Sequence, residues 1–426
     1  MSLASAAAHG AFPVWLIAPF AVLLLAIALG PLAFPHFWHR RYAVVAGGLA
    51  AGSAACQLAI LRQPGPLVHA LEEYVGFIAL IASLYIVSGG IHIRVKGEAT
   101  PAVNCVFLLI GAVLANFIGT TGASMLLIRP WIRMNKYRIT AFHVVFFIFI
   151  VSNVGGCLTP IGDPPLFMGY LKGVPFWWVA ARCWPSWAAA VLGLIVVFYG
   201  FDRANFLRAP AEVREAETAV EQWSFRGLHN VFFLALILLS VLLAPPVWRE
   251  AIMVAASLGS WFTTAREFHD LNSFSFDPVK EVAWLFIGIF ITMVPALNYL
   301  QASPPPITSA LGFYWATGAL SAVLDNAPTY LAFLAAALGN QGLALNSPAD
   351  VLAFTASQPS TLQAVSLGAV FFGAMTYIGN GPNFMVKAIA EHAKVRTPGF
   401  IGYTVRFALP ILLPILAIVG AIFLSK

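Results

Sequence analysis

The segment that most constrains the fold runs from residue 140 to 171, where a long apolar run is interrupted by SNVGGCLTPIGDPP. Each proline removes an amide donor and clashes with the preceding turn, so a continuous helix is excluded there. In a bilayer, such a break leaves N–H and C=O groups that lipid cannot satisfy, so it must be buried in protein or line a wet cavity. The alternative is an ordinary Pro/Gly loop between two short buried helices.

The rest of the chain is as apolar as this segment. Of its 426 residues, 60% are hydrophobic and 9% are charged, whereas charged residues make up about 25% of a soluble protein. Apolar runs of about 17–25 residues recur along the chain, which predicts an all-α polytopic membrane protein with about ten transmembrane helices. The net charge of +6 is explained by basic loops and requires no nucleic acid. The four cysteines are scattered singly, which predicts neither a disulfide nor a metal site.

The positions of Lys and Arg predict the orientation in the membrane. The N-terminal segment carries neither, whereas the first loop carries two arginines, so the N-terminus is expected outside. Both flanks of 102–128 are basic, which predicts a re-entrant hairpin that enters and leaves from the cytoplasm and is interrupted at NFIGTTGAS. The polar stretch 202–228 is expected to be a cytoplasmic connector. A second hairpin, 308–339, should open to the outside, so cysteines at Asn135 and Asn346 should react from opposite sides.

The layout of the first half recurs in the second. The hairpin 308–339 and the broken span 365–391 repeat the order of 102–128 and 140–171. An odd number of predicted spans separates the two hairpins, so the halves should have opposite orientation. We therefore expect two inverted repeats, residues 1–201 and 229–426, joined by the connector.

Residue types match as well as order. TPIGDPPLFM in the first break aligns with TYIGNGPNFM in the second, so Thr159 matches Thr376 and Asp163 matches Asn380. GAVLANFIGTTGASM likewise aligns with TGALSAVLDNAPTYL in the two hairpins. Inverted repeats whose interrupted helices meet at the midplane are typical of secondary transporters, and the site lies where the interruptions converge.

The interruptions bring many polar residues to the expected midplane. The predicted ion or substrate ligands are Thr120, Thr121, Ser124, Ser152, Asn153, Thr159, Asp163, Asp325, Asn326, Thr329, Thr376, Asn380 and Asn383, with Asn116 nearby. Hydroxyls, amides and freed carbonyls are hard oxygen ligands that suit Na⁺ or Li⁺. Half-helix N-termini also suit an anion, so the charge of the substrate depends on the carboxylates.

Asp163 and Asp325 come from opposite halves of the chain. Two aspartates held near each other out of water could exchange protons for a cation, which makes them the predicted Na⁺ site. Asp325 precedes Asn-Ala-Pro and is also typical of a helix N-cap, a role that does not exclude ion binding. Lys387 either neutralises an aspartate in the empty state or extends to the cytoplasmic face. His143 is either a packing residue or part of a proton relay.

The LDNAPT hairpin, the SNVGG…TPIGDPP break and the inverted layout resemble the ion transporter superfamily. The resemblance is closest to the NhaD-type sodium/proton antiporters and their arsenite-permease and citrate-transporter-like relatives. It implies a transport domain with ion sites at the hairpin tips, a scaffold domain and a homodimer. The family motifs map onto Asn153, Gly155, Gly156, Thr159, Pro160, Ile161, Gly162, Asp163, Asp325 and Asn326. At the first hairpin Gly119-Thr120-Thr121 replaces an Asp-Asn-Thr-type tip, which leaves the number of bound cations open.

The leading hypothesis is therefore a Na⁺(Li⁺)/H⁺ antiporter. We expect it in a cell membrane, the bacterial inner membrane, with no cofactor other than the transported Na⁺ and H⁺. The alternative is a Na⁺- or H⁺-coupled carrier of citrate, a dicarboxylate or arsenite, although the Ser-Asn-Thr tips of dicarboxylate carriers are absent. A membrane enzyme would need a nucleophile with a base, an HExxH or an Asp-rich metal motif, and the sequence contains none. The sequence also lacks a Walker motif for direct use of ATP.

Overall fold

The computed structural model describes residues 13–60, 62, 64–94, 99–208, 224–272 and 274–425, and it is 79% helical. The helices of the first half are η1 (Val14–Ile17), α2 (Ala18–Ala33), α3 (Pro35–Ile60), α4 (Gly65–Gly89), α5 (Pro101–Met134), α6 (Ala141–Ile150), η2 (Val154–Gly156), α7 (Pro164–Leu171) and α8 (Trp178–Arg208). Those of the second half are α10 (Asn230–Leu243), α11 (Trp248–Thr263), α12 (Arg266–Leu271), α13 (Asp277–Ala302), α14 (Ala310–Ser321), α15 (Asn326–Gly339), α16 (Pro348–Ser357), α17 (Pro359–Phe372), η3 (Gly373–Met375), α18 (Gly381–His392), α19 (Phe400–Tyr403), η4 (Thr404–Leu412) and α20 (Leu413–Leu424).

Seven helical segments in the described part of the chain are long and apolar enough to cross a membrane. They are η1 with α2, then α3, α4, α5, α8, α13 and the continuous segment from α19 to α20. Shorter apolar helices include α6, α10 and α17. The prediction of an all-α polytopic membrane protein is therefore confirmed. The number of spans and the side from which each hairpin enters stay predictions.

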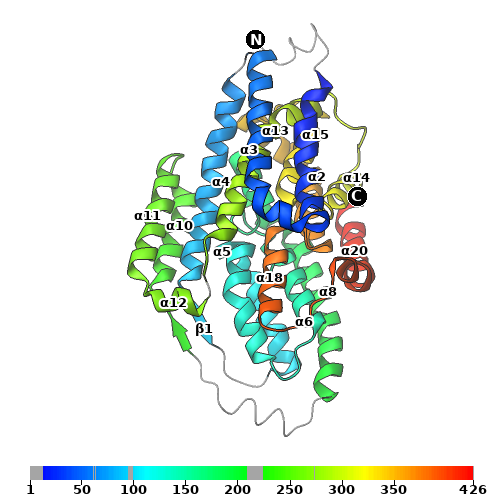
Figure 1. Cartoon of the computed structure of the whole chain (residues 1–426). Coiled ribbons are helices and arrows are strands. Elements are labelled where there is room, and N and C mark those ends of the chain that lie inside the picture. The colour runs from blue at the N-terminus through cyan, green and yellow to red at the C-terminus, as the bar shows by residue number, and fades with distance from the viewer. Residues whose placement is uncertain are drawn as a thin grey trace.

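Two short strands join loops that are far apart in the sequence. The strand β1 (His92–Arg94) pairs antiparallel with β2 (Ser224–Arg226), and the pair lies at one end of the molecule (Figure 1). The positive-inside rule assigns both loops to the cytoplasm, so the pairing agrees with the predicted orientation. The helix α8 runs beyond the predicted span to Arg208, and residues 209–223 of the predicted connector lie outside the described residues.

The helices divide into two groups that meet along α4 and α13. One, which we call the scaffold group, contains α2, α3, α4, α10, α11 and α13, with α4 packed on α11 and α13 packed on α3. The other, the hairpin group, contains the helices from α5 to α8 and from α14 to α20. Contacts of α4 with α5 and of α13 with α15 join the groups. Figure 1 shows α10 and α11 beside α4, with α5, α6, α8 and α18 on the other side of α4.

The first predicted hairpin is a helical hairpin that turns at Gly119. Its backbone there has φ 76° and ψ 154°, a conformation that essentially only glycine adopts. The Nδ2 of Asn104 lies 2.8 Å from Oδ1 of Asn135, and the rings of Phe107 and Trp131 stack at 5.4 Å. In an unbroken helix, residues 31 positions apart would be about 46 Å apart. The two arms of α5 are therefore antiparallel.

Both predicted breaks interrupt their helices. After α6 the chain is irregular apart from η2 until α7 begins at Pro164, and after α17 it is irregular apart from η3 until α18 begins at Gly381. The second hairpin turns between α14 and α15, which pack against each other. The sequence predicted the positions of these interruptions because proline and glycine destabilise the interior of a helix.

Positions that the two halves share make the same contacts. The hydroxyl of Thr159 donates to the carbonyl of Asn116 at 2.6 Å, and the hydroxyl of Thr376 donates to the carbonyl of Ala322 at 2.7 Å. In each case the donor lies in a break, and the acceptor lies at the equivalent position of the preceding hairpin. This equivalence supports the repeat that the sequence predicts, and the inverted orientation of the halves stays a prediction.

The inverted orientation predicts opposite accessibility for the bases of the two hairpins. Asn135 is buried, so a cysteine there would disturb the hairpin base, and the exposed neighbour Lys136 replaces it as a labelling position. The exposed Gln341 serves for the second hairpin. In a variant without native cysteines, Lys136→Cys and Gln341→Cys should react with an impermeant maleimide from opposite sides of the membrane. Reaction of both from one side would contradict the inverted repeat.

Candidate functional site

The carboxylate of Asp163 lies where three interruptions meet. Its side chain is 1% exposed. The Thr120 hydroxyl, at the tip of the first hairpin, donates to Oδ1 at 2.7 Å. The Asn380 amide, in the second break, donates to Oδ1 at 2.9 Å, and the Asn326 amide, at the tip of the second hairpin, donates to Oδ2 at 2.7 Å. The two halves of the chain therefore share this one carboxylate.

Asp163 occupies the N-cap position of α7, but its side chain does not cap the helix. No cap hydrogen bond from its carboxylate is formed, and α7 opens with Pro164 and Pro165, which have no N–H to donate. A carboxylate that only capped a helix would accept from the backbone of the first turn. All three donors to Asp163 instead come from other segments. Its position is therefore explained by the site and not by the stability of α7.

Asp325 does act as a cap. Its carboxylate accepts from the backbone N–H of Ala327 at 3.1 Å at the start of α15, and the Thr329 hydroxyl donates to its carbonyl at 2.9 Å. The residue that contacts Asp163 is its neighbour, Asn326. The structure thus brings the second hairpin tip to Asp163 through the amide, and direct sharing of an ion by the two carboxylates stays a prediction.

The predicted amide ligands form a layer between the two breaks. Asn153 Nδ2 donates to Asn383 Oδ1 at 2.6 Å, and Asn380 Nδ2 lies 3.2 Å from Asn153 Oδ1. Asn383 Nδ2 in turn donates to the carbonyls of Gly373 and Thr376 at 2.8 and 2.9 Å. These carbonyls are the groups that the break leaves without helical partners. Asn153 and Asn383 therefore hold the broken backbone together and orient Asn380.

The other predicted ligands lie in the same region. Ser124 and Ser152 share a hydrogen bond of 2.7 Å between the first hairpin and the first break. Asn116 donates to the carbonyl of Gly155 at 2.7 Å and accepts from the N–H of Leu158 at 2.7 Å. The hydroxyls of Thr159 and Thr376 bond hairpin carbonyls as described above, so these residues also satisfy irregular backbone.

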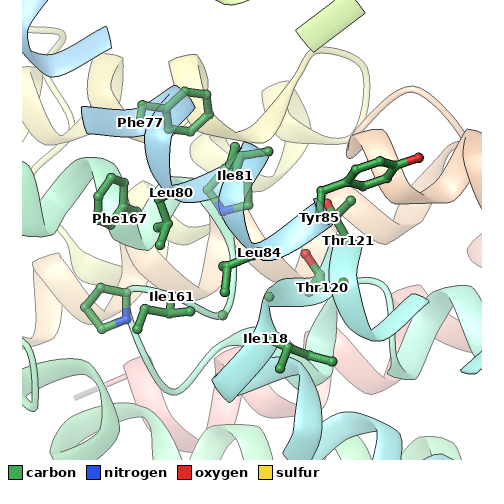
Figure 2. Close-up of a pocket in the computed structure, with 15 residues that line it drawn as sticks. Phe77, Leu80, Ile81, Leu84, Tyr85, Ile118, Thr120, Thr121, Ile161 and Phe167 are labelled. Carbon is green, nitrogen blue, oxygen red and sulfur yellow. The ribbon is translucent and has the colours of Figure 1, made fainter. Parts of the chain in front are cut away.

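A small cavity separates the first hairpin tip from α4. Its volume is about 20 Å³, about what one water molecule needs. Figure 2 shows Thr120 and Thr121 beside Leu84 and Tyr85 of α4, with Leu80 further along α4 beside Phe167. The apolar face of α4 therefore covers the polar tip in this state. Thr121 is partly exposed and is not among the hydrogen-bond partners of Asp163 in the described part of the chain.

Within the described residues, neither Asp163 nor Asp325 forms an ion pair with a basic side chain. Lys387, predicted either to neutralise an aspartate or to extend to the cytoplasmic face, pairs with Glu391 one turn further along α18 at 2.6 Å. The site is therefore made of one central carboxylate, hydroxyls and amides. Such hard oxygen ligands suit a proton, Na⁺ or Li⁺ better than a soft metal.

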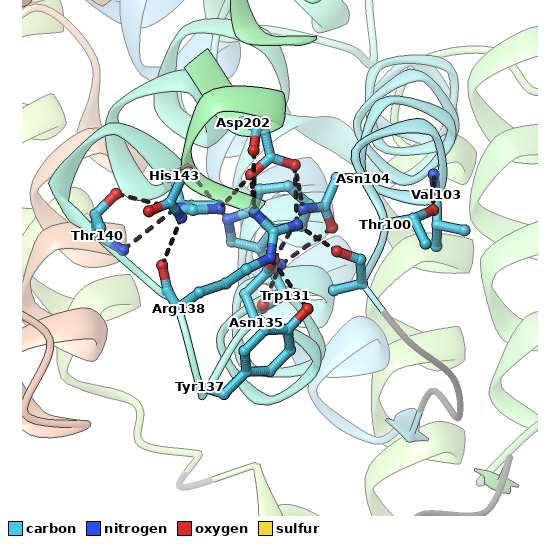
Figure 3. Close-up of polar contacts among 12 residues, drawn as sticks. Thr100, Val103, Asn104, Trp131, Asn135, Tyr137, Arg138, Thr140, His143 and Asp202 are labelled. Atoms are coloured by element: carbon cyan, nitrogen blue, oxygen red, sulfur yellow. Dashed lines mark hydrogen bonds and ion pairs between the residues drawn. The ribbon is translucent and has the colours of Figure 1, made fainter. Parts of the chain in front are cut away.

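A buried cluster of polar and charged side chains surrounds Asp202 and was not predicted from the sequence (Figure 3). Arg138 pairs with the carboxylate, His143 Nε2 lies 3.0 Å from Oδ1, and Asn104 Nδ2 donates to Oδ2 at 2.8 Å. His143 thus bonds within a closed cluster that ties α5 and α6 to α8. The apolar helical pattern continues past Asp202 and could have indicated that this residue is buried. Asp202 was instead interpreted as the start of a loop, because it lies close to the end of a predicted span.

Long apolar helices, two helical hairpins and a buried polar site between two broken helices are typical of a secondary membrane transporter. Residues 9–424 match the model of a family described as "Putative citrate transport". The match covers nearly the whole chain, so the chain belongs to this family, a membrane transporter family of the ion transporter superfamily. The description of the family is one of transport. Comparison with the curated proteins gives no match.

The hydrogen bond from Thr120 to Asp163 gives a direct test of the site. Thr120→Val keeps the shape of the side chain and removes one of three donors to a buried carboxylate, a loss of about 1.5–3 kcal/mol. We expect ion-dependent proton movement in proteoliposomes to fall about tenfold or more. The matched control is Thr355→Val, which removes a hydroxyl bonded to a carbonyl within α16. Activity equal to that of the parent in both variants would contradict a role of the Thr120–Asp163 hydrogen bond in transport.

Proposed function

We propose that the protein is a secondary active transporter in which Asp163 binds the coupling ion, and that it exchanges Na⁺ or Li⁺ for H⁺ as NhaD-type antiporters do. The observation that carries the proposal is the convergence of both hairpin tips and the second break on this carboxylate. Alternating access requires one site that both halves reach, and Asp163 meets that requirement.

The charge of the site favours a cation. A carboxylate held out of water costs several kcal/mol unless a proton, a cation or hydrogen bonds compensate it. Three donors surround Asp163, and no basic side chain within the described residues pairs with it. The Oδ1 of Asn326 is buried without a hydrogen-bond partner in the described part of the chain, so an acceptor is available beside Asp163. Carboxylate and amide oxygens together supply hard ligands for Na⁺ or Li⁺.

A second candidate is a Na⁺- or H⁺-coupled carrier of citrate, which the description of the family favours. In that case Asp163 would carry the coupling ion, and citrate would occupy a neighbouring position. A citrate anion needs several positive or N–H groups, whereas no basic side chain within the described residues pairs with Asp163, and a carboxylate without its coupling ion would repel citrate. For this reason the geometry favours cation exchange over free citrate as the transported species.

The proposal includes the location, orientation and oligomeric state of the transporter. We propose a bacterial inner membrane location with the N-terminus outside, in keeping with the distribution of Lys and Arg. The resemblance to the antiporter family favours a homodimer. Cross-linking in native membranes tests the dimer, and the labelling described above tests the orientation.

The two candidates are distinguished by a substrate panel on the purified chain in proteoliposomes with an imposed pH gradient. Antiport predicts that Na⁺ and Li⁺ dissipate the gradient, whereas K⁺ and citrate do not. Empty liposomes supply the control for leakage. Gradient-driven accumulation of labelled citrate, without proton movement on addition of Na⁺ alone, would replace antiport by the second candidate.

Competition between Na⁺ and H⁺ at one site predicts a pH-dependent affinity. The apparent affinity for Na⁺ should fall as pH falls, because protons occupy the carboxylate that Na⁺ needs. Asp325→Asn should shift this dependence if the second aspartate contributes to the same coupled site. The measurement is the Na⁺ concentration for half-maximal exchange over about three pH units, in the native chain and the variant. An affinity indifferent to pH in the native chain would contradict a shared site.

A further inference from the structure

A buried ion pair connects α7 to the scaffold group, at the end of α7 opposite Asp163. The ammonium of Lys172 lies 2.6 Å from the carboxylate of Glu73 in α4, and the two side chains are 5% and 7% exposed. Lys172 also donates to Oδ1 of Asn346 at 2.9 Å, beyond the base of the second hairpin. This one cation therefore contacts the scaffold group and the segment that follows the second hairpin.

The same end of α7 makes further contacts with the scaffold group. The hydroxyl of Tyr170 donates to the carbonyl of Val241 in α10 at 2.7 Å. The guanidinium of Arg249 in α11 lies over the rings of Phe167 and Tyr170, at 6.0 and 5.9 Å from their centroids. Three helices of the scaffold group, α4, α10 and α11, thus contact this end of α7.

Asp163 and Lys172 are the two cap residues of α7, which has eight residues and is about 12 Å long. A helix this short is rigid, so a displacement at Lys172 displaces Asp163 as well. Movement of the hairpin group along α4 would have to separate Lys172 from Glu73, because the two residues belong to different groups.

We propose that the Glu73–Lys172 ion pair holds α7, and with it Asp163, against α4 in this state, and that the pair opens when the site changes sides. The change of sides rests on the proposed transport function. Glu73 and Lys172 are positioning residues, since they act on Asp163 through α7. Glu73 also faces His69 in α4, whose Nε2 lies 3.1 Å away, and Arg249 and Glu250 of α11 form their own pair beside α4.

The test measures how often α4 uncovers the first hairpin tip. The reporter is Ile118→Cys in the full chain without native cysteines, because Ile118 lies beside the turn of the first hairpin, lines the cavity that α4 covers and is 3% exposed. The readout is the rate of reaction with N-ethylmaleimide in detergent, with no ion gradient. The rate follows the population of the open state. From a population of about 1% or less, within the usual range of about 0.1–10% for a minor state, loss of the ion pair in Glu73→Gln should raise the rate about tenfold. The control is Glu72→Gln, which changes an exposed carboxylate on the same helix.

Two double variants complete the test. Exchange of the charges, Glu73→Lys with Lys172→Glu, should return the rate to that of the parent. Glu73→Gln with Lys172→Met leaves no unpaired buried charge, so it should fold and also react faster. Unchanged rates in Glu73→Gln and in the neutral double variant would overturn the proposal, as would a raised rate that charge exchange does not lower. The assay needs no transported ion, so failure of Na⁺/H⁺ exchange in proteoliposomes would be a separate result.

Discussion

The structure depends on one constraint: backbone polar groups that the two breaks free inside the membrane must find partners within the protein. Amides and hydroxyls meet this need. Asn116 bonds the irregular backbone of the first break, and Asn383 bonds that of the second. Thr159 and Thr376 tie each break to the preceding hairpin. With these groups engaged, the carboxylate of Asp163 is the charged group on which the hairpin tips converge.

The polar residues of this region have two different roles. Asn153 and Asn383 maintain the geometry of the breaks, while Thr120, Asn326 and Asn380 contact the carboxylate directly. Because α7 carries Asp163 at one end and Lys172 at the other, the site and the boundary with α4 are mechanically linked. An ion that changes the charge at Asp163 therefore acts on a helix that the scaffold group also holds.

The breaks were predictable, because proline and glycine act locally on the helix that contains them. The sequence placed Asp163, Asn326 and Asn380 in one region for the same reason. It could not say which amides contact the carboxylate and which support the backbone, since that depends on contacts over more than 200 positions, such as Asn380 with Asp163. The buried charges of Asp202 and Glu73 were missed because a charge in an apolar pattern resembles a loop until its partner is known.

Exchange of a proton for the transported cation at Asp163 can be measured directly. Na⁺ is added to the purified chain in weakly buffered detergent solution, and the release of protons is followed with a pH dye. We expect release in the native chain and none in Asp163→Asn, which keeps the shape of the side chain and loses the titrating charge. Thermal unfolding of both proteins shows whether the variant is folded. Equal proton release from a folded Asp163→Asn variant would contradict proton exchange at Asp163.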